Sequence, residues 1–310
     1  MAVTRPDICV IANPNSGTVA RNPQALTQAM QIFGPRATLR PFKGDPAPTA
    51  AAAAREGFAI IVAAGGDGTV AGVAHALAGT ASALAVLPFG TFNYFARGLQ
   101  MPEDAAQAAG AILQGRPHAI DVGTLNGRVF LNNVSIGLYP QILEEREASY
   151  ARWGRYRMLA HLASLRTILR FQRPYRMTLD LDGTRQLIRT PMVFVARSAY
   201  QLDQFGLDGA QAISADRFVM FLAPQQTRLG FLRLAWKLLR KRVDHGRDVL
   251  VSAPARIGIS VPGRSRVSVA LDGEKLKMDL PLRIELAEGR LNVILPPQKT
   301  PADPGVGMAG

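Results

Sequence analysis

The stretch FAIIVAAGGDGTVAGVAHAL, residues 58 to 77, decides the fold of this chain. Its apolar run ends in Gly65-Gly66-Asp67-Gly68-Thr69, and a small-residue pattern of helical spacing follows. Glycines let the backbone approach a ligand closely, so N–H groups and the next helix N-terminus can face an anion. Asp67 beside phosphates requires a Mg²⁺ ion or a ribose hydroxyl between the charges. The stretch predicts a strand, a metal-nucleotide turn and a helix, with an ordinary glycine turn as the alternative.

The composition favours a folded protein with a large core. The chain has 310 residues, of which 48% are hydrophobic, and this predicts two domains or one domain with a large appended lobe. Its single cysteine, Cys9, lies in an apolar run, so we expect a buried thiol and a reducing compartment. No apolar run reaches transmembrane length, so neither secretion nor membrane spanning is expected.

The net charge of +13 is concentrated in the later part of the chain. Lys and Arg outnumber Asp and Glu by 8 to 7 in residues 1–125, by 13 to 8 in residues 126–227 and by 15 to 8 in residues 228–310. A nearly neutral first part and a basic remainder indicate that the second part meets an anionic surface, either nucleic acid or acidic lipid headgroups.

The first 120 residues alternate strand and helix patterns. Such alternation predicts a doubly wound, Rossmann-like α/β domain with a parallel sheet, whose ligands lie at the carboxyl ends of the strands. The predicted strands are residues 3–12, 36–39, 58–64 and 83–87, and the predicted helices are residues 23–33, 48–56, the segment up to 77, and 105–113.

From residue 120 the pattern changes to short alternating strands, which predict an antiparallel β-sandwich. Asp182-Gly183 and Asp272-Gly273 are hairpin turn signals. The expected strands are residues 129–134, 175–181, 186–196, 217–222, 256–261, 266–271 and 282–286. We therefore predict an α/β domain at 1–122, a β-sandwich domain at 123–296, a nucleotide cleft between them, and a disordered tail at 297–310.

Four motifs in order resemble the bacterial diacylglycerol kinase and lipid kinase family, which shares its catalytic domain with sphingosine kinases. The motifs are NPNSG at 13–17, GGDGT at 65–69, PFGTFN at 88–93 followed by FAR at 95–97, and DGE at 272–274. The segment NNVSIG at 132–137 is similar to the one that opens the second lobe in that family. Each motif alone is weak, but their ordered set across nearly the whole chain is specific.

The resemblance implies a two-lobe kinase that transfers the γ-phosphoryl group of ATP to a lipid hydroxyl. Glu274 would accept the proton of that hydroxyl, with Asp272 beside it. Asp67 and Asp121 would bind Mg²⁺, and Asp216 is a weaker ligand candidate. The residues implied to bind nucleotide are Asn13, Ser16, Gly17, Gly65, Gly66, Asp67, Gly68, Thr69, Thr91 and Asn93.

Simpler interpretations and departures from the family pattern stand beside these assignments. Asp121 could be an ordinary turn carboxylate at a strand end, and the DGE motif could be a plain hairpin turn. Tyr94 stands where the family usually has Asp, which removes an anionic charge near the expected metal. Arg217 follows Asp216 where Asp-Gly is common in members with an additional structural Mg²⁺ site.

Two basic stretches, residues 150–171 and 228–247, combine aliphatic and Trp residues with Arg and Lys at helical spacing. Both are typical of helices that lie in a membrane interface, although a core-packing helix with a solvated basic face fits equally well. Because the implied acceptor is a lipid, we expect a cytoplasmic protein that binds anionic membranes peripherally. A homodimer is left open, and no nucleic-acid partner is expected.

Two rival functions share parts of the pattern. NAD kinases also combine an Asn with a GGDGT segment on a two-lobe plan, but PFGTFN, DGE and the basic stretches are not required by a soluble nucleotide acceptor. A regulatory protein with a degenerate kinase fold, binding membranes or nucleic acid, is the second rival, because Tyr94 replaces a charged residue. The basic excess accompanies apolar residues, and no nucleic-acid-binding module is recognised.

Overall fold

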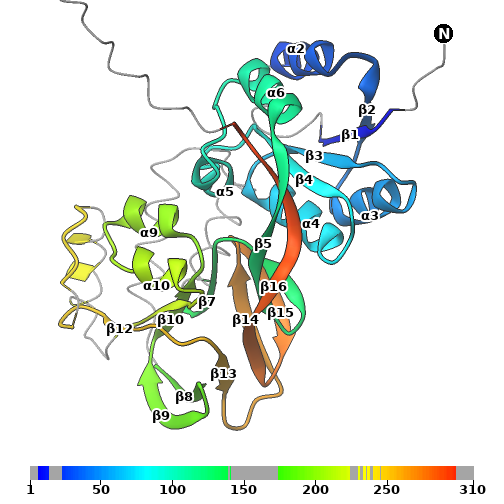
Figure 1. The fold of residues 1–310 in the computed structure, drawn as a ribbon. Helices are drawn as coiled ribbons and strands as arrows, with labels where there is room; N and C mark the ends of the chain where they lie inside the picture. Colours follow the sequence, from blue (N-terminus) through cyan, green and yellow to red (C-terminus); the bar gives the residue numbers. More distant parts are fainter. Residues whose placement is uncertain are drawn as a thin grey trace, which may run out of the picture.

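The fold is described from a computed structural model, shown in Figure 1. The described residues are 6–13, 23–138, 140, 174–223, 230, 233–234, 236–237, 240–244 and 246–297. The predicted helix at 150–171 and parts of the predicted helix at 228–247 lie outside this part of the chain, as do residues 298–310. No described helix is long and apolar enough to cross a bilayer.

The N-terminal part is the predicted Rossmann-like α/β unit. Its four strands are parallel, in the order β2-β1-β3-β4. Figure 1 shows α2 and α6 on one face of this sheet and α3 and α4 on the other. The elements are β1 (Ile8–Ala12), α2 (Pro23–Phe33), a 3₁₀ turn (Gly34–Arg36), β2 (Ala37–Pro41), α3 (Ala47–Arg55), β3 (Ile60–Gly65), α4 (Asp67–Leu77), β4 (Ala83–Pro88), α5 (Tyr94–Gly98) and α6 (Ala105–Gln114).

The burial of these strands explains why they appear as apolar runs in the sequence. All five residues of β1 are buried, and β3 and β4 are almost as apolar, as expected for strands covered by helices on both faces. Cys9 is buried in β1 as a free thiol, and burial raises its pKa to about 11. The cysteine is therefore a core residue, as predicted.

The C-terminal part adds an antiparallel sheet and extends the first sheet. Sheet B has the order β12-β11-β10-β7-β14-β15, and its inner face packs on the extended part of sheet A around Phe130, Ile136 and Met177. The elements are β5 (Arg116–Leu125), β6 (Arg128–Phe130), β7 (Asn133–Gly137), β8 (Tyr175–Leu181), β9 (Thr184–Thr190), β10 (Met192–Ala196), α9 (Ala199–Phe205), α10 (Ala210–Ser214), β11 (Val219–Leu222), β12 (Leu250–Ser252), β13 (Ile257–Ser260), β14 (Arg266–Leu271), β15 (Glu274–Asp279) and β16 (Leu282–Leu295).

The long strand β16 joins the two parts of the molecule. Near its start it pairs with β13, and near its end Val293 pairs in parallel with Leu84 of β4. Sheet A is therefore continuous from β2 through β16 to β9. Its register against β5 shifts between Ala287 and Leu291, and a bulge of this kind bends and twists a strand. The predicted boundary between residues 122 and 123 stays a prediction.

Two expected strands are divided in the structure. The predicted strand at 186–196 breaks at Pro191, which has no N–H to donate, and its halves β9 and β10 belong to different sheets. The predicted strand at 129–134 breaks between β6 and β7, where backbone N–H groups bind the Asp272 carboxylate instead of a neighbouring strand. The hairpin signals are confirmed, because Asp182-Gly183 and Asp272-Gly273 have positive φ values at the β8–β9 and β14–β15 turns.

Candidate functional site

The glycine turn between β3 and α4 is packed against a second turn, formed by residues 88–93. Phe89 N–H donates to the Gly65 carbonyl at 3.0 Å. A Cβ on Gly66 would lie 3.1 Å from the Cα of Gly90, and a Cβ on Gly90 would lie 2.5 Å from the Cα of Gly66. A Cβ on Gly65 would overlap the Thr69 side chain. The contact of the two turns thus requires glycine at positions 66 and 90, whereas Thr69 requires glycine at position 65.

The side chain of Asn93 stabilises the second turn through hydrogen bonds to the backbone of that turn. It is buried and has φ 51°, in the left-handed region that Asn tolerates better than most residues. Its Oδ1 accepts from Gly90 N–H at 2.8 Å, and its Nδ2 donates to the Gly90 carbonyl at 3.1 Å. The amide predicted to contact nucleotide is thus engaged within the protein, where it fixes the shape of the turn.

Asp67 connects the glycine turn with α5. Its Oδ1 accepts from Phe95 N–H at 3.3 Å, at the start of that helix. Burial raises the pKa of Asp67, and hydrogen bonds from the backbone N–H groups of Phe95, Tyr94 and Asn93 oppose this rise. The carboxylate therefore lies between the N-terminal ends of α4 and α5, where the helix dipoles favour a negative charge.

Asp272 holds the segment between β6 and β7. Its two oxygens accept from the N–H groups of Leu131 at 2.7 Å, Asn132 at 2.7 Å and Asn133 at 2.9 Å. Removal of the carboxylate from water raises the pKa of Asp272 to about 6, and the three hydrogen bonds act in the opposite direction. The sequence predicted a catalytic role for Asp272 beside Glu274. In the structure, the Asp272 carboxylate instead binds backbone N–H groups and holds a segment of the chain in place.

Glu274, the last residue of the DGE motif, lies next to the glycine turn. It is the first residue of β15, and its side chain is 55% exposed. A Cβ on Gly68 would lie 3.5 Å from Glu274 Oε1, so the carboxylate lies beside the first turn of α4. Arg128 Nη2 is 3.8 Å from Glu274 Oε2. Two motifs about 200 residues apart in the sequence thus lie side by side.

The other carboxylates predicted to bind metal have separate partners. Asp121 Oδ1 accepts from Gly289 N–H at 2.5 Å and so closes the bulge of β16. Asp216 follows α10 and forms an ion pair with Arg197 at 3.1 Å. Within the described ranges, no group of three or more His, Cys, Asp or Glu side chains could hold a metal ion.

Residues 7–125, which include the glycine turn, match the family model described as the diacylglycerol kinase catalytic domain. The diacylglycerol kinase of Bacillus subtilis (strain 168) is 27% identical over 301 residues, which cover 94% of this chain and 96% of that protein. The chain thus contains a diacylglycerol kinase catalytic domain, and over nearly its whole length it is similar to a bacterial diacylglycerol kinase. The relative named "Probable lipid kinase YegS-like" in Chromohalobacter salexigens is 38% identical over 113 residues, covering 35% of this chain and 36% of the relative.

Solved structures share the fold of this lipid kinase. A diacylglycerol kinase structure from Bacillus anthracis str. Sterne has a TM-score of 0.66 at 20% identity and covers 94% of this chain and 97% of that chain. A second structure from the same organism has a TM-score of 0.71 at 23% identity, with the same coverage. The two-part architecture predicted from sequence is therefore confirmed.

The remaining predicted nucleotide residues lie around the same turns of the kinase. Asn13 follows β1, Thr69 is half-buried in the first turn of α4, and Thr91 is exposed in the second turn. Ser16 and Gly17 lie outside the described residues. These positions are compatible with a shared site, and their contacts with nucleotide stay predictions.

Sequence reasoning gave no role to Arg97, Glu103 and Tyr200, although a contact between Arg97 and Tyr200 joins the two parts of the kinase. Arg97 Nη1 lies 3.5 Å from the Tyr200 hydroxyl, and Arg97 Nη2 pairs with Glu103 at 2.9 Å. Tyr94, noted only as a missing acid, stacks on the exposed ring of Phe92 with centroids 5.4 Å apart. Arg97 was part of a recognised motif, whereas Tyr200 and Glu103 had no sequence signal that linked them to it.

Proposed function

We propose that this kinase transfers the γ-phosphoryl group of ATP to the hydroxyl of a lipid such as diacylglycerol or a related lipid alcohol. One observation carries the proposal. Glu274, a half-exposed carboxylate, lies beside Gly68 at the N-terminus of α4, so a proton acceptor and an anion-binding helix end share one site. The match to the diacylglycerol kinase catalytic domain supports the same reaction class, and the relatives are named for lipid substrates.

The nucleotide phosphates would lie at the start of α4. This helix has eleven residues, so the partial positive charge at its N-terminus favours phosphate oxygens. The glycines let the two turns pack closely together beside this helix end. We assign nucleotide binding to residues 1–122 and acceptor binding to residues 123–296, with the reaction between them.

Glu274 would accept the proton of the lipid hydroxyl. A neutral alcohol attacks phosphorus poorly unless a group at hydrogen-bond distance takes its proton. Arg128 lies 3.8 Å from this carboxylate, and the ion pair helps orient Glu274. Asp272 supports the arrangement indirectly, because it fixes the turn from which Glu274 projects.

Mg²⁺ fits this site only as an ion held mainly by nucleotide phosphates. Magnesium is commonly bound by one or two carboxylates together with phosphates and water, and Asp67 is the carboxylate at the start of α4. The described residues offer no cage of three acidic side chains, and Asp121 and Asp216 have their own partners. When bound, the ion would neutralise charge on the transferred phosphoryl group.

The test is product formation from labelled ATP and Mg²⁺ with diacylglycerol, sphingosine or NAD as separate acceptors. We expect a labelled lipid product in the wild type. Glu274→Gln should lower kcat by about 10²-fold or more while nucleotide binding is retained. Labelled NAD would favour the NAD kinase alternative. Transfer to no acceptor, with ATP still bound, would favour a pseudokinase, and full activity of Glu274→Gln would refute the assigned proton acceptor.

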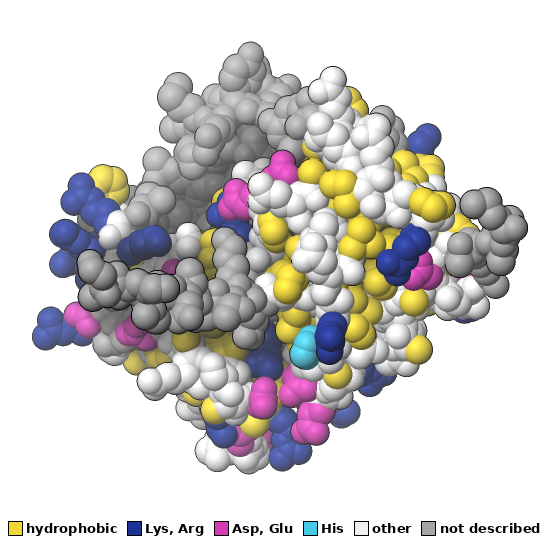
Figure 2. All heavy atoms as spheres, turned by 45° about the horizontal axis from the view of Figure 1, so that its top comes forward, with side chains coloured by type: hydrophobic (Ala, Val, Ile, Leu, Met, Phe, Trp, Pro, Cys, Tyr) yellow, Lys and Arg dark blue, Asp and Glu magenta, His cyan; other side chains and the backbone are white. Residues whose placement is uncertain are grey.

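We further propose that the kinase binds anionic membranes through the basic segment around Trp236. The indole is 55% exposed, and the guanidinium of Arg240 lies 4.3 Å from its centroid. Leu234 is buried, so the segment has an apolar inner side and a basic outer side. In Figure 2, Lys and Arg side chains gather at the left edge, where Figure 1 places this segment.

Vesicle sedimentation tests this membrane surface. We expect stronger binding to vesicles that contain phosphatidylglycerol than to phosphatidylcholine vesicles, with the difference reduced by added salt. Trp236→Ala should weaken binding to the anionic vesicles, whereas Ile32→Ala, which alters an exposed apolar residue on α2, should not. Equal sedimentation with both vesicle types at low salt would contradict the proposal.

A further inference from the structure

A pocket on the outer face of sheet A lies apart from the residues assigned to phosphoryl transfer. It has a volume of about 560 Å³, which lies within the range of small-molecule sites. Strands β8, β13 and β16 form its floor, and the β8–β9 hairpin forms one wall. None of the residues assigned to nucleotide, metal or proton transfer lines it.

The depth of this pocket comes from β13. Outward-facing positions on the neighbouring strands carry long side chains, whereas β13 presents Gly258 and Ser260 between them. A Cβ on Gly258 would lie 3.1 Å from the Cβ of Asp180, so the glycine opens the floor where the strands pack tightly. The core residues Ile257 and Ile259 alternate with these small residues and face the other way.

The wall of the pocket holds an oriented arginine. Asp180 Oδ2 accepts from Arg185 Nε at 3.0 Å, and Asp180 Oδ1 accepts from Gly183 N–H at 3.0 Å. Both carboxylate oxygens are therefore occupied in holding the hairpin and Arg185. Because the ion pair uses Nε, the terminal Nη groups of Arg185 are left to meet a ligand.

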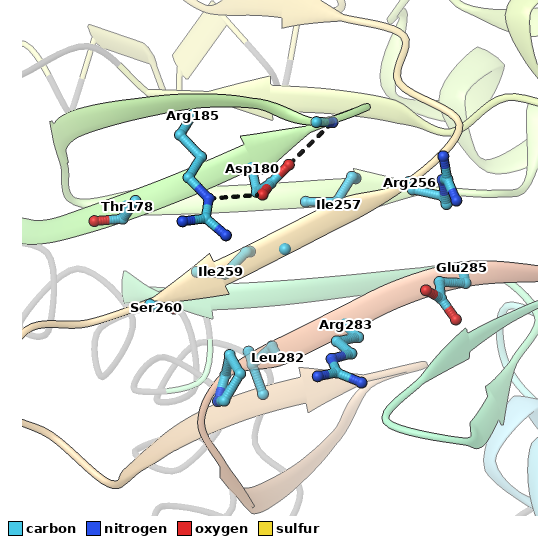
Figure 3. Close-up of a pocket in the computed structure, with 13 residues that line it drawn as sticks. Thr178, Asp180, Arg185, Arg256, Ile257, Ile259, Ser260, Leu282, Arg283 and Glu285 are labelled. Atoms are coloured by element: carbon cyan, nitrogen blue, oxygen red, sulfur yellow. Dashed lines mark hydrogen bonds and ion pairs between the residues drawn. The ribbon is translucent and has the colours of Figure 1, made fainter.

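Two further arginines line the same hollow. Figure 3 shows Arg185 and Arg283 on opposite sides of β13, with Arg256 at one end of the strand. Counting Asp180 and Glu285 as anions, the three guanidinium groups leave one net positive charge. Arginine is well suited to phosphate because its planar N–H groups can bind two oxygens at once.

Glu285 adds a requirement that simple anions do not meet. It lies two residues from Arg283 on the same face of β16, and a carboxylate there repels a ligand that offers only negative charge. A ligand with hydroxyl groups can donate to Glu285 while its phosphate binds the arginines. Thr178 and Ser260 add two hydroxyls to the lining.

We propose that this pocket binds a phosphate ester that also carries free hydroxyl groups, the chemistry of glycerol phosphate. Such a group occurs both in small soluble metabolites and in the headgroups of anionic phospholipids. The pocket is separate from the site of phosphoryl transfer, so the proposal does not depend on the acceptor of the kinase.

Calorimetric titration of the full chain with glycerol 3-phosphate at low salt tests the soluble source. The double variant Arg256→Gln/Arg283→Gln should bind at least about tenfold more weakly, because hydrogen bonds to charged groups are lost. Arg189→Gln is the matched control, since Arg189 is exposed on β9 but does not line the pocket. Inorganic phosphate should bind more weakly than glycerol 3-phosphate.

Vesicle sedimentation with and without phosphatidylglycerol tests the lipid source. Selective loss of vesicle binding in the double variant, without detectable binding of glycerol 3-phosphate, would support a lipid headgroup as the ligand. Equal affinity for inorganic phosphate and glycerol 3-phosphate would refute the role of Glu285. If the double variant matched Arg189→Gln in both assays, the pocket would not be a phosphate site. Unchanged circular dichroism spectra verify that the variants are folded.

Discussion

At the residue scale, the acidic side chains predicted to bind metal or to act in catalysis are mostly engaged in holding the backbone. Asp67 binds N–H groups at the start of α5, Asp272 binds the 131–133 segment, and Asp121 binds the bulge of β16. Glu274 differs, because it is half-exposed beside α4. A motif residue can thus be required for catalysis without touching a substrate, since it determines where the backbone of the site lies.

Asp272 should give the folding stability a distinct pH dependence. Its pKa is about 6 in the folded chain and near the ordinary 3.8 when unfolded, so the folded state binds the proton more tightly. The raised pKa of Asp272 therefore adds up to about 3 kcal/mol to the free energy of unfolding. This stabilisation is complete below pH 4 and is lost as the pH rises through 6. Urea unfolding at pH 5 and pH 7 should show this loss in the wild type.

The variant Asp272→Asn lacks this titration. Its free energy of unfolding should therefore fall below the wild-type value by a smaller amount at pH 7 than at pH 5. Asp279→Asn is the control, because the Asp279 carboxylate is exposed and forms an ion pair with Arg266 on the surface. Parallel pH profiles for wild type and Asp272→Asn would show that Asp272 has no raised pKa.

Asp121 gives a second prediction at this scale, which separates a structural role from a metal-binding role. Asp121→Ala removes the acceptor for Gly289 N–H, which should cost about 1 kcal/mol of stability even in a metal chelator. Thermal unfolding with and without EDTA measures the effect. A destabilisation that appears only when Mg²⁺ is present would identify Asp121 as a metal ligand instead.

At the element scale, the contact between the two glycine turns is the feature that the sequence pattern could not reveal. The GGDGT and PFGTFN motifs were predicted to bind one nucleotide, but Gly66 and Gly90 primarily touch each other. Strand boundaries show a similar limit. Helix α2 was predicted to the residue, whereas β16 runs nine residues beyond its predicted end because its outer half pairs with β5 and β4.

The turn contact predicts opposite outcomes for two glycine substitutions. Gly90→Ala places a methyl group 2.5 Å from Gly66 Cα, and separating the turns should cost about 1–3 kcal/mol and lower kinase activity. Gly110→Ala in α6 meets no atom within 4 Å and should stabilise the protein by about 0.5–1 kcal/mol. Chemical denaturation of both variants compares them. Equal stability of Gly90→Ala and wild type would mean that the turns are not in close contact.

At the scale of the whole molecule, the continuous sheet A should make the two parts unfold together. Breaking β16 disrupts pairing with β4 and β5 in one part and with β13 in the other. The contacts between Arg97 and Tyr200 and between His75 and Val129 also join the two parts. We expect a single urea transition, with the same midpoint by far-UV circular dichroism and by fluorescence. Two separated transitions would show that the parts fold independently.

The sequence alone determined the α/β and antiparallel halves, because buried parallel strands appear as apolar runs and hairpins carry Asp-Gly turns. It also identified the motifs of the lipid kinase family. Only the tertiary structure decided which motif residues face the site and which face the backbone. Glu274 meets Gly68 because β7, β14 and β15 pair in one sheet and Asp272 ties that sheet to residues 131–133. Such long-range packing leaves no local periodicity, so residue patterns could name these side chains but could not place them.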